Sequence, residues 1–252
     1  MTDFIAATDK NLLQKNGLHH FEALWALKLP QIDEPNTERG GWSNVCYLTI
    51  GNKGYYLKRQ TNHLTRSLKA PFGKPTFARE FRNIQRYQRL GIPAVTAAFF
   101  GMRTQGHDKQ AILLTHALDG WQDLQSYLLN WQQLPTEEQQ AIIKACGRLL
   151  KQLHDKKILH GCFYPKHIFL KPHEDWFEIC LIDLEKTRKL LFGKKDRLKD
   201  LDTLTRRTKN YWAEPEYRSL LSHYLDRASQ SIEVDHWLKL LIQRNKNKEN
   251  RA

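Results

Sequence analysis

The chain has 252 residues, and its 40 lysine and arginine residues against 27 aspartate and glutamate residues give a formal net charge of +13. This length suits one domain or two small lobes with a real core, and the charge favours anionic partners such as phosphates, a membrane surface or nucleic acid, although a basic protein without such a partner is the plain alternative. No apolar run approaches the roughly 20 residues of a membrane-spanning helix, and the first residues lack the features of a signal peptide. The four cysteines form no CxxC pair, which is typical of reduced thiols in a cytosolic chain and not of a disulfide framework.

The chain begins with a mixed segment and continues into a hairpin. Residues 1–38 are predicted to be an N-terminal extension with one short helix over 20–29. A strand over 42–50 follows, and the turn at 51–54 connects it to a second strand over 55–60.

Glycines stand at the entry of this hairpin. Gly40, Gly41 and Ser43 leave backbone N–H groups open to a phosphate, because no bulky side chain blocks the approach. A plain hairpin with a glycine-rich lead-in is the commoner cause of this pattern. Lys58 lies on the second strand and, taken alone, is equally consistent with an ordinary surface lysine.

A basic loop is predicted over 61–75, and an amphipathic helix follows it. Thr76 is the expected N-cap and Gly91 the expected stop of this helix. Glu80 lies at the edge of the apolar face. It is either solvated among the arginines of the helix or turned inward to hold Lys58.

Two further strands, over 94–100 and 111–115, complete a small and mostly antiparallel sheet with one helix laid on it. The segment 115–120 is then a natural connector. The boundary between two lobes is therefore expected near Leu118.

The remainder of the chain is predicted to be mainly helical. Thr136 to Gln139 is typical of a capping-box start, and the apolar stripe that follows at helical spacing indicates a core helix. Between Lys186 and Lys209 the chain has ten basic residues against three acidic ones. Helices are expected over 123–131, 136–154, 217–228 and 232–243, before a polar tail.

The stretch 159–183 carries the strongest chemical signal. His160 leads a loop, two short apolar strands follow, and the second strand ends on Asp183. An unpaired carboxylate at the end of an apolar strand is costly, so a metal ion or a donor network is expected there. His167 precedes the first of these strands and is therefore placed to lie near Asp183.

The order of glycine-rich turn, strand lysine, helix glutamate, connector, helix, His-led loop, hairpin and aspartate resembles the protein-kinase-like fold. The resemblance runs from about Gly40 to Leu241. The loop HGCFYPKHIF and the segment LIDLEKTR are similar to the InaA-type branch of the bacterial lipopolysaccharide kinase family, which includes Kdo and core-heptose kinases. This family resemblance implies an α+β bilobal fold. The N-lobe over 39–118 would be a small antiparallel sheet with one main helix, the larger C-lobe over 119–243 would be mainly helical, and 244–252 would be a polar tail.

The resemblance also implies roles. Members of this family are cytosolic and use ATP with Mg²⁺ or Mn²⁺ on sugars of the lipopolysaccharide core. ATP is expected to contact Gly40, Gly41, Ser43, Lys58, Thr115, His116 and Leu118. Asp183 and His167 are expected to hold the metal. The expected catalytic residues are Lys58, Glu80, His160, Cys162 and Asp183.

The catalytic loop departs from the kinase pattern. Where a kinase has His-Arg-Asp, this chain has His160, Gly161 and Cys162, so a cysteine stands in the position of the proton-accepting aspartate. One hypothesis is that Cys162, Tyr164 or a substrate-bound water fills this role, since a loose transition state depends little on a strong base. The alternative is a pseudokinase that binds nucleotide, lipid or a protein partner in an envelope or stress response.

Two other interpretations are disfavoured. His160, Cys162, His167 and His173 match no common zinc spacing. The basic run after Asp183 lacks the interleaved aromatic residues of single-strand binders and no nucleic-acid module is recognised, so no nucleic-acid partner is expected. A solvated basic face is the default for this run. The family resemblance favours docking to phosphorylated lipopolysaccharide or to the anionic inner-membrane surface.

Overall fold

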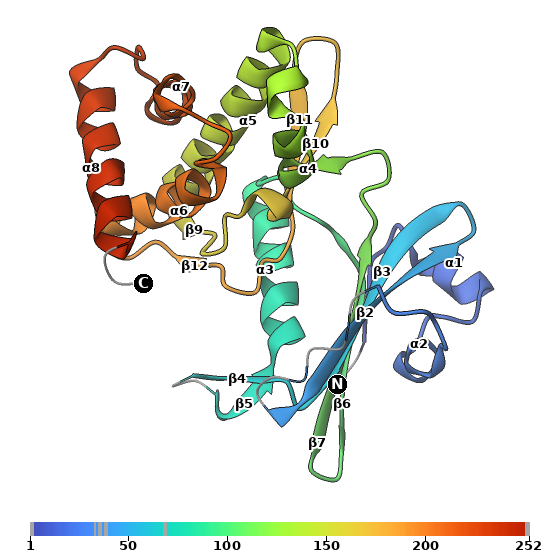
Figure 1. Ribbon diagram of the computed structural model, residues 1–252. Helices are drawn as coiled ribbons and strands as arrows, with labels where there is room; N and C mark the ends of the chain where they lie inside the picture. Colours follow the sequence, from blue (N-terminus) through green and yellow to red (C-terminus); the bar gives the residue numbers. More distant parts are fainter. Residues whose placement is uncertain (1–2, 33, 35–36, 38–39, 68–69, 250–252) are drawn as a thin grey trace. The chain divides into compact units, whose positions relative to one another are not determined.

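The computed structural model describes residues 3–32, 34, 37, 40–67 and 70–249. The chain divides into two units, Met1–Arg89 with Val95–Asp119 and Leu90–Ala94 with Gly120–Ala252. Figure 1 labels their helices and strands along the chain.

The first unit is built on an antiparallel sheet. Its strand order is β1-β6-β7-β3-β2. The strands are β1 (Phe4–Ile5), β2 (Trp42–Ile50), β3 (Lys53–Thr61), β6 (Ala97–Gln105) and β7 (Asp108–His116). The four strands predicted from the sequence are present, and β1 is added from the N-terminal extension by pairing with β6.

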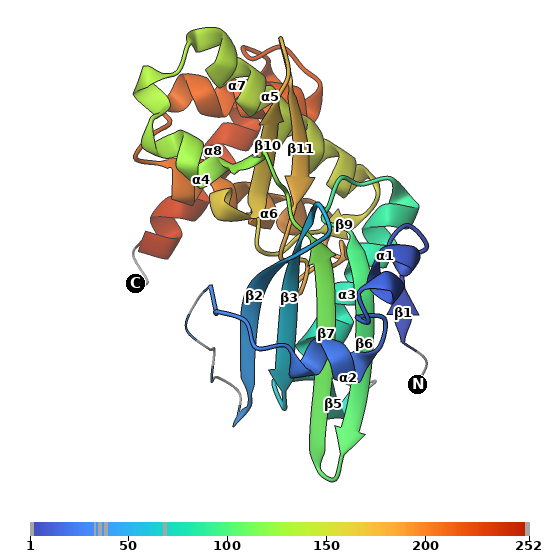
Figure 2. The ribbon, with the colours of Figure 1, turned by 90° about the vertical axis from the view of Figure 1, so that its right-hand side faces the viewer.

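Two short helices, α1 (Lys10–Lys15) and α2 (Phe21–Ala26), cover one face of this sheet (Figure 2). Leu13, Phe21 and Leu24 are almost completely buried in one cluster with side chains of β2, β3, β6 and β7. The expected helix over 20–29 corresponds to α2. The N-terminal extension is therefore part of the core of this unit, because its apolar side chains close a sheet face that would otherwise meet water.

The longer helix α3 (Thr76–Leu90) covers the opposite face. Phe81 stacks on Phe100 of β6 with ring centroids 4.3 Å apart, and Ile84 and Tyr87 are buried. On α3, Phe81 and Ile84 lie three residues apart, which is the helical spacing that the sequence predicts for the apolar face.

The start of α3 is tied to β3 by a buried glutamine. Gln60 Oε1 accepts hydrogen bonds from the Phe77 N–H and from Thr76 Oγ1, both at 2.9 Å. Thr76 was expected to cap the helix with its own hydroxyl. Instead its hydroxyl donates to Gln60, and the Gln60 carbonyl satisfies an orphan N–H of the first turn.

The expectation of a loop over 61–75 was wrong. β4 (Leu64–Ser67) and β5 (Ala70–Pro75) form an antiparallel hairpin there. Strand ladders are made by backbone groups, so a polar and basic side-chain pattern concealed the pairing. Pro75 sits at the last position of its strand, an edge placement that proline tolerates.

The second unit is mainly helical. Its helices are α4 (Leu124–Leu129), α5 (Thr136–Asp155), α6 (Gly193–Thr208), α7 (Glu214–Leu225) and α8 (Ile232–Glu249), with short 3-10 turns at Trp131–Gln133 and Pro165–His167. Its strands are β8 (Gln122–Asp123), β9 (Ile158–Leu159), β10 (Ile168–Pro172), β11 (Phe177–Leu181) and β12 (Arg188–Lys189). The β10–β11 hairpin is antiparallel and also pairs with β8.

The helix α5 forms the core of this unit. The predicted apolar stripe is buried, and a Cβ at Gly147 would come within 2.8 Å of the Leu220 carbonyl on α7. Gly147 therefore permits the close approach of α5 and α7 that Figure 1 shows. The predicted capping box is absent: the N-cap is Pro135, and the Gln139 side chain donates to the Trp131 and Leu134 carbonyls.

The basic run after Asp183 contains a helix that the sequence did not suggest. This helix, α6, buries all three of the acidic residues of the run, Asp196, Asp200 and Asp202. The last helix, α8, continues to Glu249, beyond its expected end at Gln243.

Candidate active site

Lys58 and Glu80 form an ion pair inside the first unit. Lys58 Nζ lies 2.6 Å from Glu80 Oε1, and the side chains are 20 % and 4 % exposed. Glu80 is thus not one of the solvated charges of α3. Its carboxylate points to the strand lysine, and the Gln60 contacts hold that helix to that strand.

Gly40 and Gly41, which precede β2, are favoured by different structural constraints, one on the backbone conformation and the other on packing. Gly40 has a φ of +72°, and a Cβ there would meet open space. A Cβ at Gly41 would overlap the backbone of Thr61, Asn62 and His63. Gly41 is therefore required by packing within the hairpin, whatever it contacts in addition. Ser43 lies opposite Gln60 in the ladder.

In the segment expected to line the adenine, Thr115 to Leu118, the N–H groups of the two central residues already donate hydrogen bonds within the protein. The His116 N–H donates to the Thr96 carbonyl at 3.0 Å, and the Ala117 N–H donates to the Gly54 carbonyl at 2.9 Å. Neither N–H is left to donate to a base. Leu118 lies beyond the end of β7 at His116.

A buried carboxylate fixes the His116 side chain. Asp9 is completely buried, and it accepts a 2.7 Å hydrogen bond from the Tyr55 hydroxyl and lies 3.0 Å from His116 Nε2. Burial alone would raise the pKa of Asp9, but the bonds from Tyr55 and Thr8 and the nearby His116 hold it below its ordinary value. The sequence offered no signal for this pairing, because Asp9 and His116 are far apart in the chain.

Asp183 and His167 come together in the second unit. His167 Nε2 lies 3.4 Å from Asp183 Oδ2, and Asp183 has a φ of +55°. A non-glycine residue in the left-handed region costs free energy and is concentrated at functional sites. His167 directly precedes β10 and Asp183 follows β11, so the antiparallel pairing of these two strands brings the residues to the same end of the hairpin.

The tautomer of His167 gives this pair its chemistry. His167 Nδ1 lies 3.0 Å from the Cys162 carbonyl oxygen. A carbonyl only accepts, so Nδ1 carries a hydrogen; in the neutral ring Nε2 then has a lone pair that faces the carboxylate, whereas the protonated ring donates its Nε2–H to that carboxylate. A metal cation between Nε2 and the carboxylate oxygen would take the place of that proton. The donor set therefore fits a divalent cation held by one imidazole nitrogen and one carboxylate oxygen.

Asp200 on α6 anchors the loop that precedes this pair. The His160 N–H donates to Asp200 Oδ2 at 2.7 Å, and the Gly161 N–H donates to Oδ1 at 2.8 Å. His154 Nε2 lies 3.4 Å from the same carboxylate. Sequence reasoning missed Asp200, because an acid within a basic run suggests a solvated helix.

His160 and Cys162 are both buried in this loop. His160 Nδ1 accepts the Cys162 N–H at 3.2 Å, and burial lowers the pKa of His160. Burial, followed by the Asp183 charge, raises the pKa of the Cys162 thiol, although Lys186 opposes this shift. The thiol is therefore kept protonated at neutral pH, unlike the carboxylate that a kinase has in this position.

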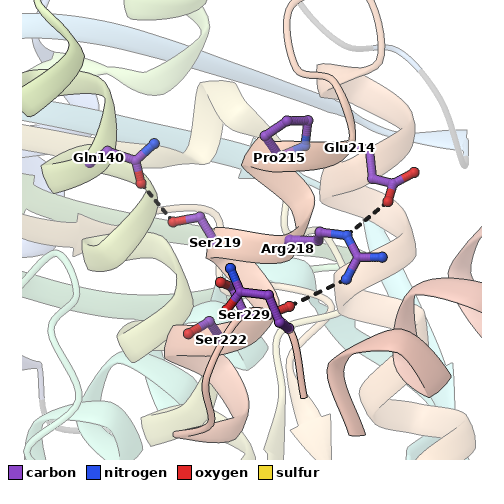
Figure 3. Close-up of a pocket in the computed structure, with 8 residues that line it drawn as sticks. Gln140, Glu214, Pro215, Arg218, Ser219, Ser222 and Ser229 are labelled. Atoms are coloured by element: carbon purple, nitrogen blue, oxygen red, sulfur yellow. Dashed lines mark hydrogen bonds and ion pairs between the residues drawn. The ribbon is translucent and has the colours of Figure 1, made fainter. Parts of the chain in front are cut away.

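A pocket of about 470 Å³ elsewhere in the second unit holds none of these residues (Figure 3). Four of its polar side chains are bonded in pairs: Ser219 Oγ donates to Gln140 Oε1 at 2.7 Å, and Arg218 pairs with Glu214 at 2.7 Å. These four side chains already have partners within the pocket.

The described residues hold no group of three or more His, Cys, Asp or Glu side chains arranged for a metal ion. Mg²⁺ in phosphoryl-transfer sites takes only one or two protein ligands besides phosphate and water, so the pair described above is sufficient in number. No helix in the same ranges has the length and apolarity needed to cross a bilayer.

Comparison with known proteins assigns the family. The model of the "Lipopolysaccharide kinase (Kdo/WaaP) family" matches residues 22–224. The chain belongs to this family. The chain is 34 % identical to "Protein InaA" of Escherichia coli (strain K12) over 175 residues, which are 68 % of this chain and 80 % of that protein. The resemblance to the InaA-type branch is thereby confirmed.

Two further similarities are to a curated kinase and to a solved structure. A 3-deoxy-D-manno-octulosonic acid kinase of Haemophilus influenzae (strain 86-028NP) is 35 % identical over 112 residues, 44 % of each chain. The solved structure "WaaP in complex with acyl carrier protein" matches with a TM-score of 0.73 at 21 % identity, over 98 % of this chain and 99 % of that one. This likeness concerns the fold. The expected α+β, protein-kinase-like fold is confirmed.

Proposed function

We propose that this member of the lipopolysaccharide kinase family is an ATP-dependent phosphotransferase that acts on a heptose or Kdo sugar of the lipopolysaccharide core. The observation that carries the proposal is the Asp183–His167 pair, in which an imidazole nitrogen and a carboxylate oxygen lie 3.4 Å apart and the aspartate has a left-handed backbone. The buried Lys58–Glu80 pair supports it independently.

Each group has a part in this reaction. ATP with Mg²⁺ or Mn²⁺ supplies the phosphoryl group and neutralises its developing charge. Lys58, oriented by Glu80, would contact the α- and β-phosphates, and Asp183 with His167 would hold the cation. Gly40, Gly41 and Ser43 would lie over the phosphates, while Thr115, His116 and Leu118 would line the adenine.

The lobe boundaries and the cellular location belong to the same proposal. Residues 39–118 and 119–243 would be the two lobes, with the helices of 1–38 added to the first and the second carried on to Glu249 by α8. The protein would work in the cytoplasm at the inner face of the inner membrane, where its positive charge meets anionic lipid and phosphorylated acceptor.

Cys162 is not the base in this proposal. The raised pKa of its thiol leaves little thiolate at neutral pH. We expect Cys162→Ala to keep turnover within about twofold of wild type, whereas loss of a working general base costs about 10²–10⁴-fold. Single-turnover kinetics measure this difference, and a hundredfold fall would assign the proton acceptor to the thiol.

A second candidate has a specific observation in its favour. A protonated, buried cysteine in the position of the catalytic aspartate is what a pseudokinase would tolerate. Such a protein would keep the nucleotide contacts of Lys58 and Asp183 and lack transfer.

Transfer of labelled phosphate from ATP to lipid A–core acceptors tests both candidates. We expect transfer by wild type and a loss of about 10²–10³-fold in Lys58→Met, the magnitude for one electrostatic contact to a transition state. Lys144→Met changes an exposed lysine of α5 and should match wild type. Stabilisation by ATP and metal without transfer to any core acceptor would select the pseudokinase.

A further inference from the structure

The turn between β12 and α6 presents two neighbouring apolar side chains to solvent. Leu191 is 68 % exposed and Phe192 is 65 % exposed. Lys189, Lys194 and Lys195 flank them and are exposed as well. We refer to residues 189–195 as the apolar tip. Figure 1 shows this part of the chain between the labels β12 and α6. Single exposed apolar residues are ordinary, but an adjacent pair between lysines is a feature of interaction surfaces.

The fold holds this exposure in place. The N–H groups of Leu191 and Phe192 both donate to Asp196 Oδ2, at 2.9 and 3.0 Å. Asp196 is buried, and the Arg188 guanidinium bonds to both of its oxygens, at 2.8 Å to Oδ2. Turning either apolar side chain inward would break these bonds. The tip is therefore a built turn that points its side chains outward.

Within the stretch 186–209, which contains the tip, the exposed charge has one sign. Asp196, Asp200 and Asp202 are the acidic residues of 186–209, and all three are buried with internal partners. The surface charge of this stretch is consequently set by its cations. The exposed ones are Lys186, Lys189, Lys194, Lys195, Lys199, Arg207 and Lys209.

We propose that the apolar tip inserts into the interfacial layer of an anionic bilayer, with Leu191 and Phe192 among the acyl chains and the surrounding lysines on the lipid phosphates. A bilayer offers both an apolar layer and a sheet of negative charge, whereas a nucleic acid offers no apolar layer for this pair. Lysine stems reach back to the headgroups while the neighbouring side chains are immersed. This inference rests on the membrane location in the proposed function, yet it needs no catalysis and none of its residues belongs to the nucleotide site.

Sedimentation with vesicles of phosphatidylcholine plus phosphatidylglycerol, compared with phosphatidylcholine alone, tests the insertion. Wild type should bind the anionic vesicles, and the double variant Leu191→Ser, Phe192→Ser should bind at least about tenfold more weakly. The matched control is Leu129→Ser with Ile232→Ser, two side chains of the same unit that are 67 % and 87 % exposed. Lys195→Glu should weaken binding by about tenfold or more, and Lys144→Glu on α5 should have little effect.

A fluorescent probe locates the contact. All four native cysteines are buried, and burial raises the pKa of Cys146 and Cys180 to about 12, so a thiol introduced by Phe192→Cys is labelled selectively. An environment-sensitive label there should shift to the blue with anionic vesicles, and the same label on Ile232→Cys should not.

Three results would overturn the inference. Wild type could fail to bind anionic vesicles, or the double variant Leu191→Ser, Phe192→Ser could bind them as well as wild type does. The label at position 192 could also shift to the blue only on addition of an acidic protein or of more of this protein, and not with lipid. Thermal stabilisation by ATP and metal is measured on the same variants. If that stabilisation persists while vesicle binding fails, the nucleotide site stands and only the membrane tip is refuted.

Discussion

Asp183→Asn should abolish the metal-dependent stabilisation of this protein by ATP. Ligand at about 100 times its dissociation constant raises the free energy of unfolding by about 2.7 kcal/mol, and we expect the variant to lose nearly all of this. Asparagine keeps the shape of the side chain and tolerates the left-handed backbone at this position, so the change removes the charge with little strain. Thermal unfolding with ATP and Mg²⁺ or Mn²⁺, against ATP and chelator, measures the effect.

Two further variants sharpen this result. Asp175→Asn makes the same change on an exposed carboxylate of the β10–β11 turn and should behave as wild type. His167→Asn replaces the imidazole with an amide oxygen, a harder ligand, and should favour Mg²⁺ relative to Mn²⁺. A wild-type response of Asp183→Asn to ATP and metal would remove this aspartate from the site.

Asp200→Ala should be among the most destabilising single changes in the second unit. It leaves the buried N–H groups of His160 and Gly161 without their acceptor. At about 1–3 kcal/mol for each of the two orphaned donors, the free energy of unfolding should fall by about 2–6 kcal/mol. At about 2–4 °C per kcal/mol for a chain of this size, the unfolding midpoint should then drop by about 4–24 °C.

The control for Asp200 is Asp155→Ala. Asp155 is half exposed and pairs with Lys151 one turn away on α5, so its loss should cost about 0.5 kcal/mol or less. Asp200→Asn retains one carbonyl oxygen and should fall between the two. A change below about 1 kcal/mol in Asp200→Ala would mean that the loop finds other acceptors.

Local patterns in the sequence were sufficient for the main elements. Alternation and turn residues predict the β2–β3 hairpin, and helical spacing predicts α3 and α5. The order of Lys58, Glu80, His167 and Asp183 along these elements was enough to suggest the family. These signals are readable because each depends on residues a few positions apart.

Elements held by distant partners escaped prediction. The β4–β5 hairpin pairs through backbone groups, and α1 is too short to be recognised by periodicity alone. The stability of α1 comes from the sheet face that it covers, which no window of the sequence contains.

The candidate site divides in the same way. The sequence by itself determined which residues are the candidates for the chemistry, because residue type and order are local properties. Only the tertiary structure decided how they are held. Gln60 joins strand to helix across 17 positions to Phe77, and Asp200 reaches back 40 positions to the His160 N–H. Burial, a tertiary property, also keeps the Cys162 thiol protonated. Such contacts depend on chain segments that meet only after folding, so their partners cannot be read from neighbouring residues.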